Sequence, residues 1–317
     1  MKRLIAIALA LIMALSLVAC GDTTKMIMGT GSVTGTYYAY GGILAQYIKN
    51  NTNINVVVAS SDGSQANIQS IDVGNFQLGA AQSDVLAYAW EGTRSFEAEG
   101  NIDSFRVIAG LYAEAVQLVT MDPEIKSVAD LAGKSVSIGA VGSGSYFNAI
   151  DILHAAGLTE KDIKARYQSF DDSADALKDG RIDAAFIVAG TPTPAITELC
   201  STGNAHLVPI NGEIADHLID NHPFYTTYSI PAGTYPGQEA DIHTVTVKAT
   251  LIVDAEADEE AVYDLTKAIF ENASAIAAEN EKGHELSIEN ATSGMAAPFH
   301  PGAARYFAEQ GVIVNVD

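Results

Sequence analysis

The stretch MIMGTGSVTGTYYAYGGIL (residues 26–44) contains an apolar run, a turn rich in glycine and hydroxyl side chains, and a helix-forming segment in direct succession. This strand–turn–helix order is the unit from which parallel α/β sheets are built. Glycine lets the backbone of such a turn approach an anion closely, and the free N–H groups at the start of a helix attract negative charge. The stretch therefore predicts an α/β fold with an anion-binding turn.

The same order of elements recurs along the chain and predicts two lobes. Strands are expected at residues 25–29, 54–60, 76–82, 105–112, 134–140, 164–170, 181–190, 205–210 and 243–254. Helices are expected at residues 37–49, 64–73, 84–90, 146–156, 174–179, 194–202 and 258–280. The chain has 317 residues, which is more than a single hydrophobic core usually organises.

We therefore expect two Rossmann-like α/β lobes joined by hinge strands. Lobe I is predicted to comprise residues 26–115 and 226–317, and lobe II residues 116–225. The predicted boundaries contain no flexible linker, so strands that pass between the lobes would form a hinge. Such a hinge would allow the lobes to open and close on a ligand.

The first 22 residues, MKRLIAIALALIMALSLVACGD, have the pattern of an export signal. A basic start and an apolar run are followed by Leu-Val-Ala-Cys, which resembles a bacterial lipobox. Residues 1–20 are thus predicted to be a lipoprotein signal peptide, with Cys20 lipidated and residues 21–25 as a tether. The alternative is an ordinary cleaved signal. Both place the mature chain outside the cytoplasm, and the lipid would anchor it to the cell membrane.

Composition argues against several classes of function. The formal net charge of −22 disfavours nucleic acid as a partner, because nucleic-acid affinity comes from Lys and Arg. The seven histidines are scattered without metal-ligand spacing, and no nucleophile–base motif occurs. Cys200 is expected to be a buried thiol. We predict a monomeric binding protein with no catalytic residues, metal or cofactor.

Four predicted strands end in small polar residues that lead into a helix, at residues 28–38, 79–86, 139–147 and 188–196. In parallel α/β sheets the ligand lies at the carboxyl ends of the strands, where these loops would converge. The predicted ligand-binding residues are Thr30, Gly31, Ser32, Thr34, Gly35, Thr36, Tyr37, Gln82, Ser83, Asp84, Ser143, Gly144, Ser145, Tyr146, Thr191 and Pro192.

Other interpretations of these loops stay open. Gly29, Gly31 and Gly35 match a variant of the dinucleotide fingerprint, but a lone match is weak evidence and no Gly-Lys-Ser/Thr follows. The glycines of any one loop could also serve only to close its turn. Asp84 could cap its helix or meet the ammonium group of a ligand.

Six segments together resemble the TAXI family, the substrate-binding subunits of one class of TRAP transporters. They are GTGSVTGTYYAYGGILAQYI (29–48), QSD (82–84), DLAGKSVSIGAVGSGSYFNAIDIL (130–153), DALKDGRIDAAFIVAGTPTPAITEL (175–199), YSIPAGTYPGQEADIHTVTVKATLIV (228–253) and PFHPGAARYFAEQGV (298–312). The resemblance implies a type II periplasmic-binding-protein fold that closes on glutamate, glutamine or a dicarboxylate such as 2-oxoglutarate. It also implies a TRAP membrane permease as partner, driven by an ion gradient.

Three alternatives remain at this point. The chain could be the receptor of an ATP-driven transporter for a thiamine-precursor-like or sulfonate ligand, a sensor domain, or an extracytoplasmic enzyme. Within the TAXI interpretation, a buried carboxylate in the cleft, with Asp84 as the candidate, favours an amino acid as ligand. A cleft without a buried carboxylate favours a dicarboxylate.

Overall fold

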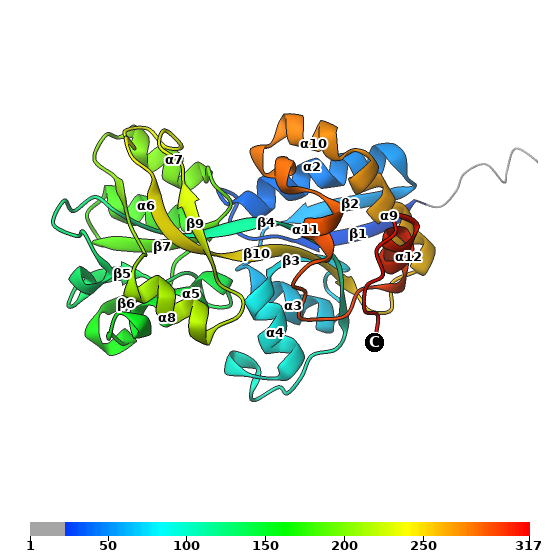
Figure 1. The fold of residues 1–317 in the computed structure, drawn as a ribbon, viewed down its shortest axis with the longest axis horizontal. Coiled ribbons are helices and arrows are strands. Elements are labelled where there is room, and N and C mark those ends of the chain that lie inside the picture. The colour runs from blue at the N-terminus through cyan, green and yellow to red at the C-terminus, as the bar shows by residue number, and fades with distance from the viewer. Residues whose placement is uncertain (1–22) are drawn as a thin grey trace, which may run out of the picture.

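The computed structural model describes residues 23–317, drawn in colour in Figure 1. The predicted signal segment and Cys20 lie outside the described residues. Among the helices of residues 23–317, none is both long enough and apolar enough to cross a lipid bilayer.

One ten-stranded sheet extends through both lobes, in the order β2-β1-β3-β10-β4-β7-β5-β6, with β8 paired to β4 and β9 to β10. The strands are β1 (Thr24–Gly29), β2 (Ile54–Ala59), β3 (Leu78–Gln82), β4 (Phe105–Thr120), β5 (Ser135–Ser137), β6 (Lys164–Arg166), β7 (Ala184–Ala189), β8 (His206–Val208), β9 (Thr226–Ile230) and β10 (Ile242–Asp254). The pairs β1/β2, β1/β3, β5/β6 and β5/β7 are parallel, whereas β4 and β10 run antiparallel to their neighbours.

Strands β4 and β10 belong to both lobes and connect them across the middle of the molecule (Figure 1). The first part of β4 pairs with β10, and its second part, from Ala115 to Thr120, pairs with β7. The sequence-based end of this strand at residue 112 was wrong. The strand continues because the following residues are almost all buried on both faces, so the ladder gains by extending.

Helices cover both faces of the sheet in each lobe (Figure 1). They are α2 (Thr36–Asn51), α3 (Ser64–Asp72), α4 (Ser83–Glu91), α5 (Gly144–Ala155), α6 (Phe170–Lys178), α7 (Pro194–Ser201), α8 (Glu213–Asn221), α9 (Glu259–Glu271), α10 (Ala273–Glu279), α11 (Ile288–Thr292) and α12 (Pro301–Glu309). The single helix expected over residues 258–280 is two helices. It breaks at Asn272, a residue type that favours helix ends because its side chain competes for backbone hydrogen bonds.

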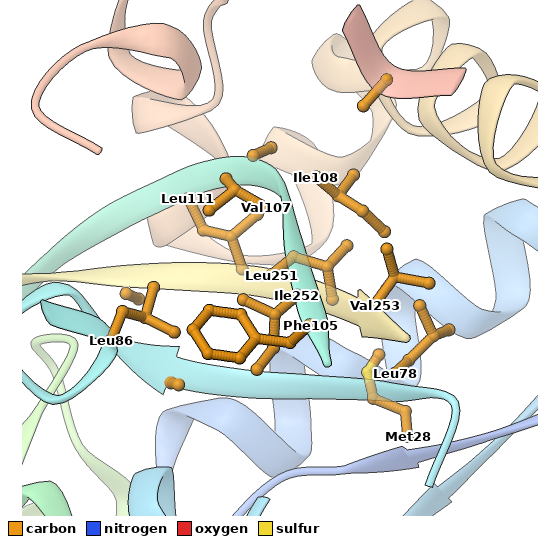
Figure 2. Packing of buried hydrophobic residues seen from close by; sticks show 14 of the residues in the cluster. Met28, Leu78, Leu86, Phe105, Val107, Ile108, Leu111, Leu251, Ile252 and Val253 are labelled. Carbon is orange, nitrogen blue, oxygen red and sulfur yellow. The ribbon is translucent and has the colours of Figure 1, made fainter. Parts of the chain in front are cut away.

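The largest hydrophobic cluster joins the two ends of the chain. Figure 2 shows Phe105 and Val107 of β4 packed beside Leu251 and Ile252 of β10. Phe307 of the C-terminal helix α12 belongs to the same cluster. The C-terminal helices therefore complete the core of the lobe that the N-terminal strands begin, while further clusters surround β5, β7 and β8. The residue boundaries assigned to the lobes stay a prediction.

Phe105 gives a test of this core. It is fully buried, so Phe105→Ala leaves a cavity at the joint of β4 and β10 and is expected to lower the free energy of unfolding by about 3–5 kcal/mol. Urea denaturation followed by circular dichroism measures this change. Val33→Ala, at a residue that is 52% exposed, is the control and should stay within about 0.5 kcal/mol. Equal, small effects of both substitutions would contradict the packing described here.

Candidate ligand-binding site

A cavity lies where the strand ends of the two lobes face each other. It is lined by Gly31, Ser32, Gly35, Thr36, Tyr37, Ser61, Asp62, Gly63, Ser64, Gln82, Glu114, Ala140, Ser143, Gly144, Ser145, Gln168, Ser169, Phe170, Val188 and Ala189. Its volume is about 50 Å³. One water molecule needs about 10–15 Å³ on that scale, so the cavity suits a small molecule rather than a nucleotide or a peptide.

Four helices begin at the wall of this cavity. Their first residues, Thr36 of α2, Ser64 of α3, Gly144 of α5 and Phe170 of α6, are all lining residues. Each N-terminus carries the equivalent of roughly half a positive elementary charge and points free N–H groups outward. The lining residues include no Lys, Arg or His. Attraction for an anion must therefore come from helix ends and hydroxyl groups.

Two of these helix starts lack a side-chain cap. Gly35 precedes α2 and Gly63 precedes α3, and neither helix start has a side-chain cap hydrogen bond. By contrast, Ser143 caps α5 and Ser169 caps α6 through their hydroxyl groups. The first-turn N–H groups of α2, and those of Ser64 and Gln65 in α3, are thus the better placed to bind an anionic ligand, whereas the Ala66 N–H of α3 is bound to the Gly142 carbonyl.

Glu114 places one buried carboxyl group in the cavity. It is 2% exposed, and the Tyr37 hydroxyl donates a hydrogen bond of 2.5 Å to its Oε2. Burial raises the pKa of Glu114 to about 8, although the hydrogen bond from Tyr37 and the charge of Lys282 act in the opposite direction. The neutral acid is therefore the major form of Glu114 at pH 7.

The sequence analysis missed Glu114. The sequence does contain a pattern that points to this residue. Glu114 is one of only two charged residues in the apolar run FRVIAGLYAEAVQLVT (residues 105–120). A charged side chain inside a buried strand is rarely there without a partner or a function. The prediction that the strand ends at residue 112 hid this signal, because it placed Glu114 in a connection.

Two amide oxygens add to the acceptors of the cavity. Gln82 Oε1 and Gln168 Oε1 are buried, lack a hydrogen-bond partner, and belong to side chains that line the cavity. A buried acceptor without a partner carries a free-energy cost of about 1–3 kcal/mol, which a ligand donor can remove. The cavity thus offers donors at helix ends and acceptors at Glu114 and the two glutamines.

The lobes are closed around the cavity by contacts of the chain itself. The Thr36 hydroxyl donates to the carbonyl oxygen of Gly190 at 2.9 Å. The Asp171 carboxylate of α6 accepts hydrogen bonds from Ser32 and, at 2.8 Å, from Thr34. These contacts join the loop after β1 to elements that follow β6 and β7, so they exist only while the lobes are closed.

The structure brings together nine of the residues predicted to bind the ligand. They are Gly31, Ser32, Gly35, Thr36, Tyr37, Gln82, Ser143, Gly144 and Ser145. The predicted loops after β1, β3 and β5 thus meet at one cavity, as expected for the carboxyl ends of strands that share a sheet.

The other predicted residues lie outside the lining of the cavity. They are Thr30, Thr34, Ser83, Asp84, Tyr146, Thr191 and Pro192. The Thr30 hydroxyl donates to the Ala59 carbonyl at 2.7 Å, and the Ser83 hydroxyl accepts from the Lys248 N–H at 3.2 Å. Both hydroxyls therefore fix the backbone. Thr34 contacts Asp171, as described above.

Asp84, Tyr146, Thr191 and Pro192 are also held by the protein. Asp84 is fully buried and accepts a hydrogen bond from Asn148 at 2.9 Å. The Tyr146 ring packs edge to face on its neighbour Phe147. Thr191 and Pro192 line a separate, more open pocket. The part of the cavity lining that comes from β7 ends at Ala189, so Thr191 and Pro192 in the following loop lie outside it.

Two further loops line the cavity that the sequence analysis did not include. Residues 61–64 follow β2 and residues 168–170 follow β6, and both loops lead into helices. They repeat the pattern of small polar residues after a strand. The first was left as the connection between the predicted strand 54–60 and helix 64–73, and the second was assigned to the end of the predicted strand 164–170. Among residues 23–317, no group of three or more His, Cys, Asp or Glu side chains is arranged to hold a metal ion.

Comparison with solved structures identifies the fold. SsuA of Xanthomonas axonopodis pv. citri, an alkanesulfonate-binding protein bound to MOPS, is 15% identical with a TM-score of 0.50, over 91% of this chain and 85% of that one. PhnD1 of Prochlorococcus marinus with methylphosphonate is 13% identical with a TM-score of 0.52, over 78% and 85%. A periplasmic transporter protein is 11% identical with a TM-score of 0.55, over 92% and 93%.

These similarities confirm the predicted type II periplasmic-binding-protein fold, with two α/β lobes and shared strands between them. The model of the NMT1-like family matches residues 28–311, which include both lobes and every loop of the cavity. The chain belongs to the NMT1-like family.

Proposed function

We propose that this chain is an extracytoplasmic solute-binding receptor of a membrane transporter, and that its ligand is a small α-amino acid such as glutamate or glutamine. The observation that carries the proposal is the buried carboxyl group of Glu114 beside four helix N-termini in one closed cavity. An α-amino acid has one group for each of these features. Its carboxylate suits the N–H groups of α2 and α3, and its ammonium group suits Glu114.

The charge distribution supports a zwitterion over a dianion. A dicarboxylate could only accept a hydrogen bond from the neutral form of Glu114, and no cationic side chain among the lining residues would offset its second negative charge. An ammonium group instead gains a charge-assisted hydrogen bond to Glu114 and can also donate to unpartnered Gln82 or Gln168. From the sequence, Asp84 was the candidate for the buried carboxylate that would favour an amino acid as ligand. In this proposal Glu114 has that role.

We further propose, on the resemblance of its sequence motifs, that the receptor serves a TAXI-type TRAP permease and is anchored to the membrane through Cys20. Differential affinity for the closed state would drive the lobes together on the ligand. Large TRAP-type membrane subunits encoded next to this chain would support this assignment. Mass spectrometry of the exported protein tests the lipid on Cys20.

A second candidate is the receptor of an ATP-driven transporter for a sulfonate or a thiamine-precursor-like ligand. The likeness to an alkanesulfonate-binding protein favours it. Glu114 favours a ligand with an ammonium group over an alkanesulfonate, because a sulfonate has no cationic group that could ionise this buried acid and form a charge-assisted hydrogen bond with it. An ATPase gene beside this chain would favour the second candidate.

Titration calorimetry with one panel of ligands tests the proposal. The panel contains L-glutamate, L-glutamine, 2-oxoglutarate, succinate and an alkanesulfonate. We expect one of the two amino acids to bind most tightly. If a ligand without an ammonium group binds most tightly, the amino-acid assignment is refuted. If no compound of the panel and none of the remaining amino acids gives a heat of binding, the receptor assignment is refuted.

Proton release is a specific signature of the Glu114 contact. Glu114 is protonated below about pH 8, so an ammonium group that binds there should ionise it, and this contact should contribute close to one released proton per L-glutamate at pH 7. Calorimetry in buffers of different ionisation enthalpy measures this number. This contribution, measured as the difference in proton release between wild type and Glu114→Gln, should be close to one for L-glutamate and near zero for any ligand without an ammonium group. Equal release from wild type and Glu114→Gln would show that another group loses the proton.

Gly144 provides a test of closure. A Cβ added at Gly144 would lie 1.6 Å from Gln82 Oε1 across the cavity. In Gly144→Ala the Gln82 amide must therefore move into the cavity or the lobes must stay apart, and either change should weaken ligand binding at least about tenfold, or about 1.4 kcal/mol. Binding is measured by calorimetry with the tightest ligand of the panel.

The matched control is Gly42→Ala in helix α2. A Cβ at Gly42 meets nothing within 4 Å, so affinity should be unchanged. Both variants should keep the melting temperature of the wild type or exceed it, since alanine is the better helix former. Unaltered affinity in Gly144→Ala would contradict the closed geometry.

A further inference from the structure

A buried polar cluster lies between the lobes, outside the lining of the ligand cavity. Asn148 of α5 donates hydrogen bonds to Asp84 of α4 at 2.9 Å and to the Tyr225 hydroxyl at 2.8 Å. The Tyr225 hydroxyl donates to Asp151 at 3.2 Å, and Arg94 pairs with Asp151 at 2.7 Å. Helix α5 begins at the cavity wall, so the same helix that meets the ligand also makes these contacts.

Asp84 is the unusual member of the cluster. Both Asp84 and Asn148 have an exposed fraction of 0%. Asp84 makes none of the ion pairs found in residues 23–317, because the nearby cation Arg94 is bound to Asp151. Backbone N–H groups of Asp84 and Val85 at the start of α4 act to lower the pKa of Asp84, but the ionisable side chains that act on it or feel its charge include no cation; they are Asp151, Tyr88, Tyr225 and Glu114. An ionised carboxylate here would be buried without a counter-ion, which is costly.

Two oxygen atoms of the pair lack partners. Asp84 Oδ1 and Asn148 Oδ1 are both buried and accept no hydrogen bond, although the two side chains are already joined through Asp84 Oδ2 and Asn148 Nδ2. A carboxylate offers no donor for the amide oxygen. A carboxylic acid does, because its O–H donates to the amide oxygen while the amide N–H donates to the other carboxyl oxygen. One proton would therefore satisfy both side chains.

We propose that Asp84 and Asn148 form a latch between the lobes that carries one proton when the lobes are closed and releases it when they open. In the open form Asp84 meets water and is an ordinary carboxylate. Closing takes a proton from solvent onto Asp84, and opening returns it. The latch rests on the two-lobe fold and on contacts between residues that do not themselves line the cavity, and it does not depend on which ligand the cavity holds.

The direction of the pH dependence follows from the burial of Asp84. Burial in the closed form raises the pKa of Asp84 to about 7, whereas an exposed aspartate titrates near 4. A group whose pKa is higher in the closed form stabilises that form at low pH, and the stabilisation is lost as pH rises through the closed-form pKa. The equilibrium between open and closed forms should therefore shift toward open by about tenfold between pH 6 and pH 8.

A disulfide that closes the lobes allows a test without a ligand. Ala66 and Gly142 lie on opposite lobes, with a hydrogen bond of 3.1 Å from the Ala66 N–H to the Gly142 carbonyl. A Cβ placed at Gly142 lies 3.5 Å from the Ala66 Cβ, which is within the range of about 3.5–4.5 Å for a disulfide. The double variant Ala66→Cys, Gly142→Cys should thus lock the closed form when oxidised. Gly142 has a φ of +86°, so the new Cys is strained, but this strain is common to all the variants compared below.

The first measurement is the carboxyl ¹³C titration of Asp84 in the oxidised double variant. The resonance is assigned by its loss in the same protein with Asp84→Asn. We expect a midpoint near pH 7. A midpoint below pH 5 in the locked form would overturn the proposal, since the latch would then close without a proton.

The second measurement is the equilibrium of the disulfide with a dithiol reductant at pH 6 and pH 8. Thiol ionisation affects all variants equally, so it cancels in the ratio of the double variant to the same protein with Asp84→Asn, whose amide pair needs no proton. This ratio should fall about tenfold from pH 6 to pH 8. An unchanged ratio would overturn the proposal. Asn148→Leu, which removes the partner, should weaken the disulfide at both pH values. These outcomes do not depend on whether L-glutamate or any other ligand binds.

Discussion

The backbone ladder between β4 and β10 is the constraint on which the rest of the molecule depends. Because both strands pass from one lobe into the other, the lobes share one sheet and can only open by bending or twisting these strands. Glu114 lies at the crossing point. It pairs with Val247 on β10, and the next residue, Ala115, begins the pairing with β7 in the second lobe. The buried carboxyl group thus lies where the lobes meet.

Around this fixed carboxyl group, the loops of both lobes supply mobile partners. The helix starts of α2 and α3 come from one lobe, and those of α5 and α6 come from the other. Closing the lobes brings all four dipoles to one small volume, which strengthens their field because water is excluded. Under the proposed function, such a cavity selects for a small molecule that carries both signs of charge.

Sequence patterns predicted the fold well because it depends on local order. Apolar runs, glycine-rich turns and helix-period segments gave the parallel strands and most helices, and they located loop residues such as Gly31, Thr36 and Gly144 at the cavity. Side chains whose role depends on distant neighbours could not be assigned in the same way. Asp84 follows a strand as a ligand contact should, yet its partner Asn148 is 64 positions away and belongs to the other lobe. Thr191 follows β7 in the same manner but lies in a different pocket.

The most direct test of the central claim is a crystal structure of the protein with L-glutamate in the cavity. The account predicts that the ligand ammonium group lies within hydrogen-bond distance, about 3 Å, of the Glu114 carboxylate. The α-carboxylate should contact N–H groups in the first turns of α2 and α3. A ligand held with its ammonium group away from Glu114, or a carboxylate in contact with Glu114, would contradict the account.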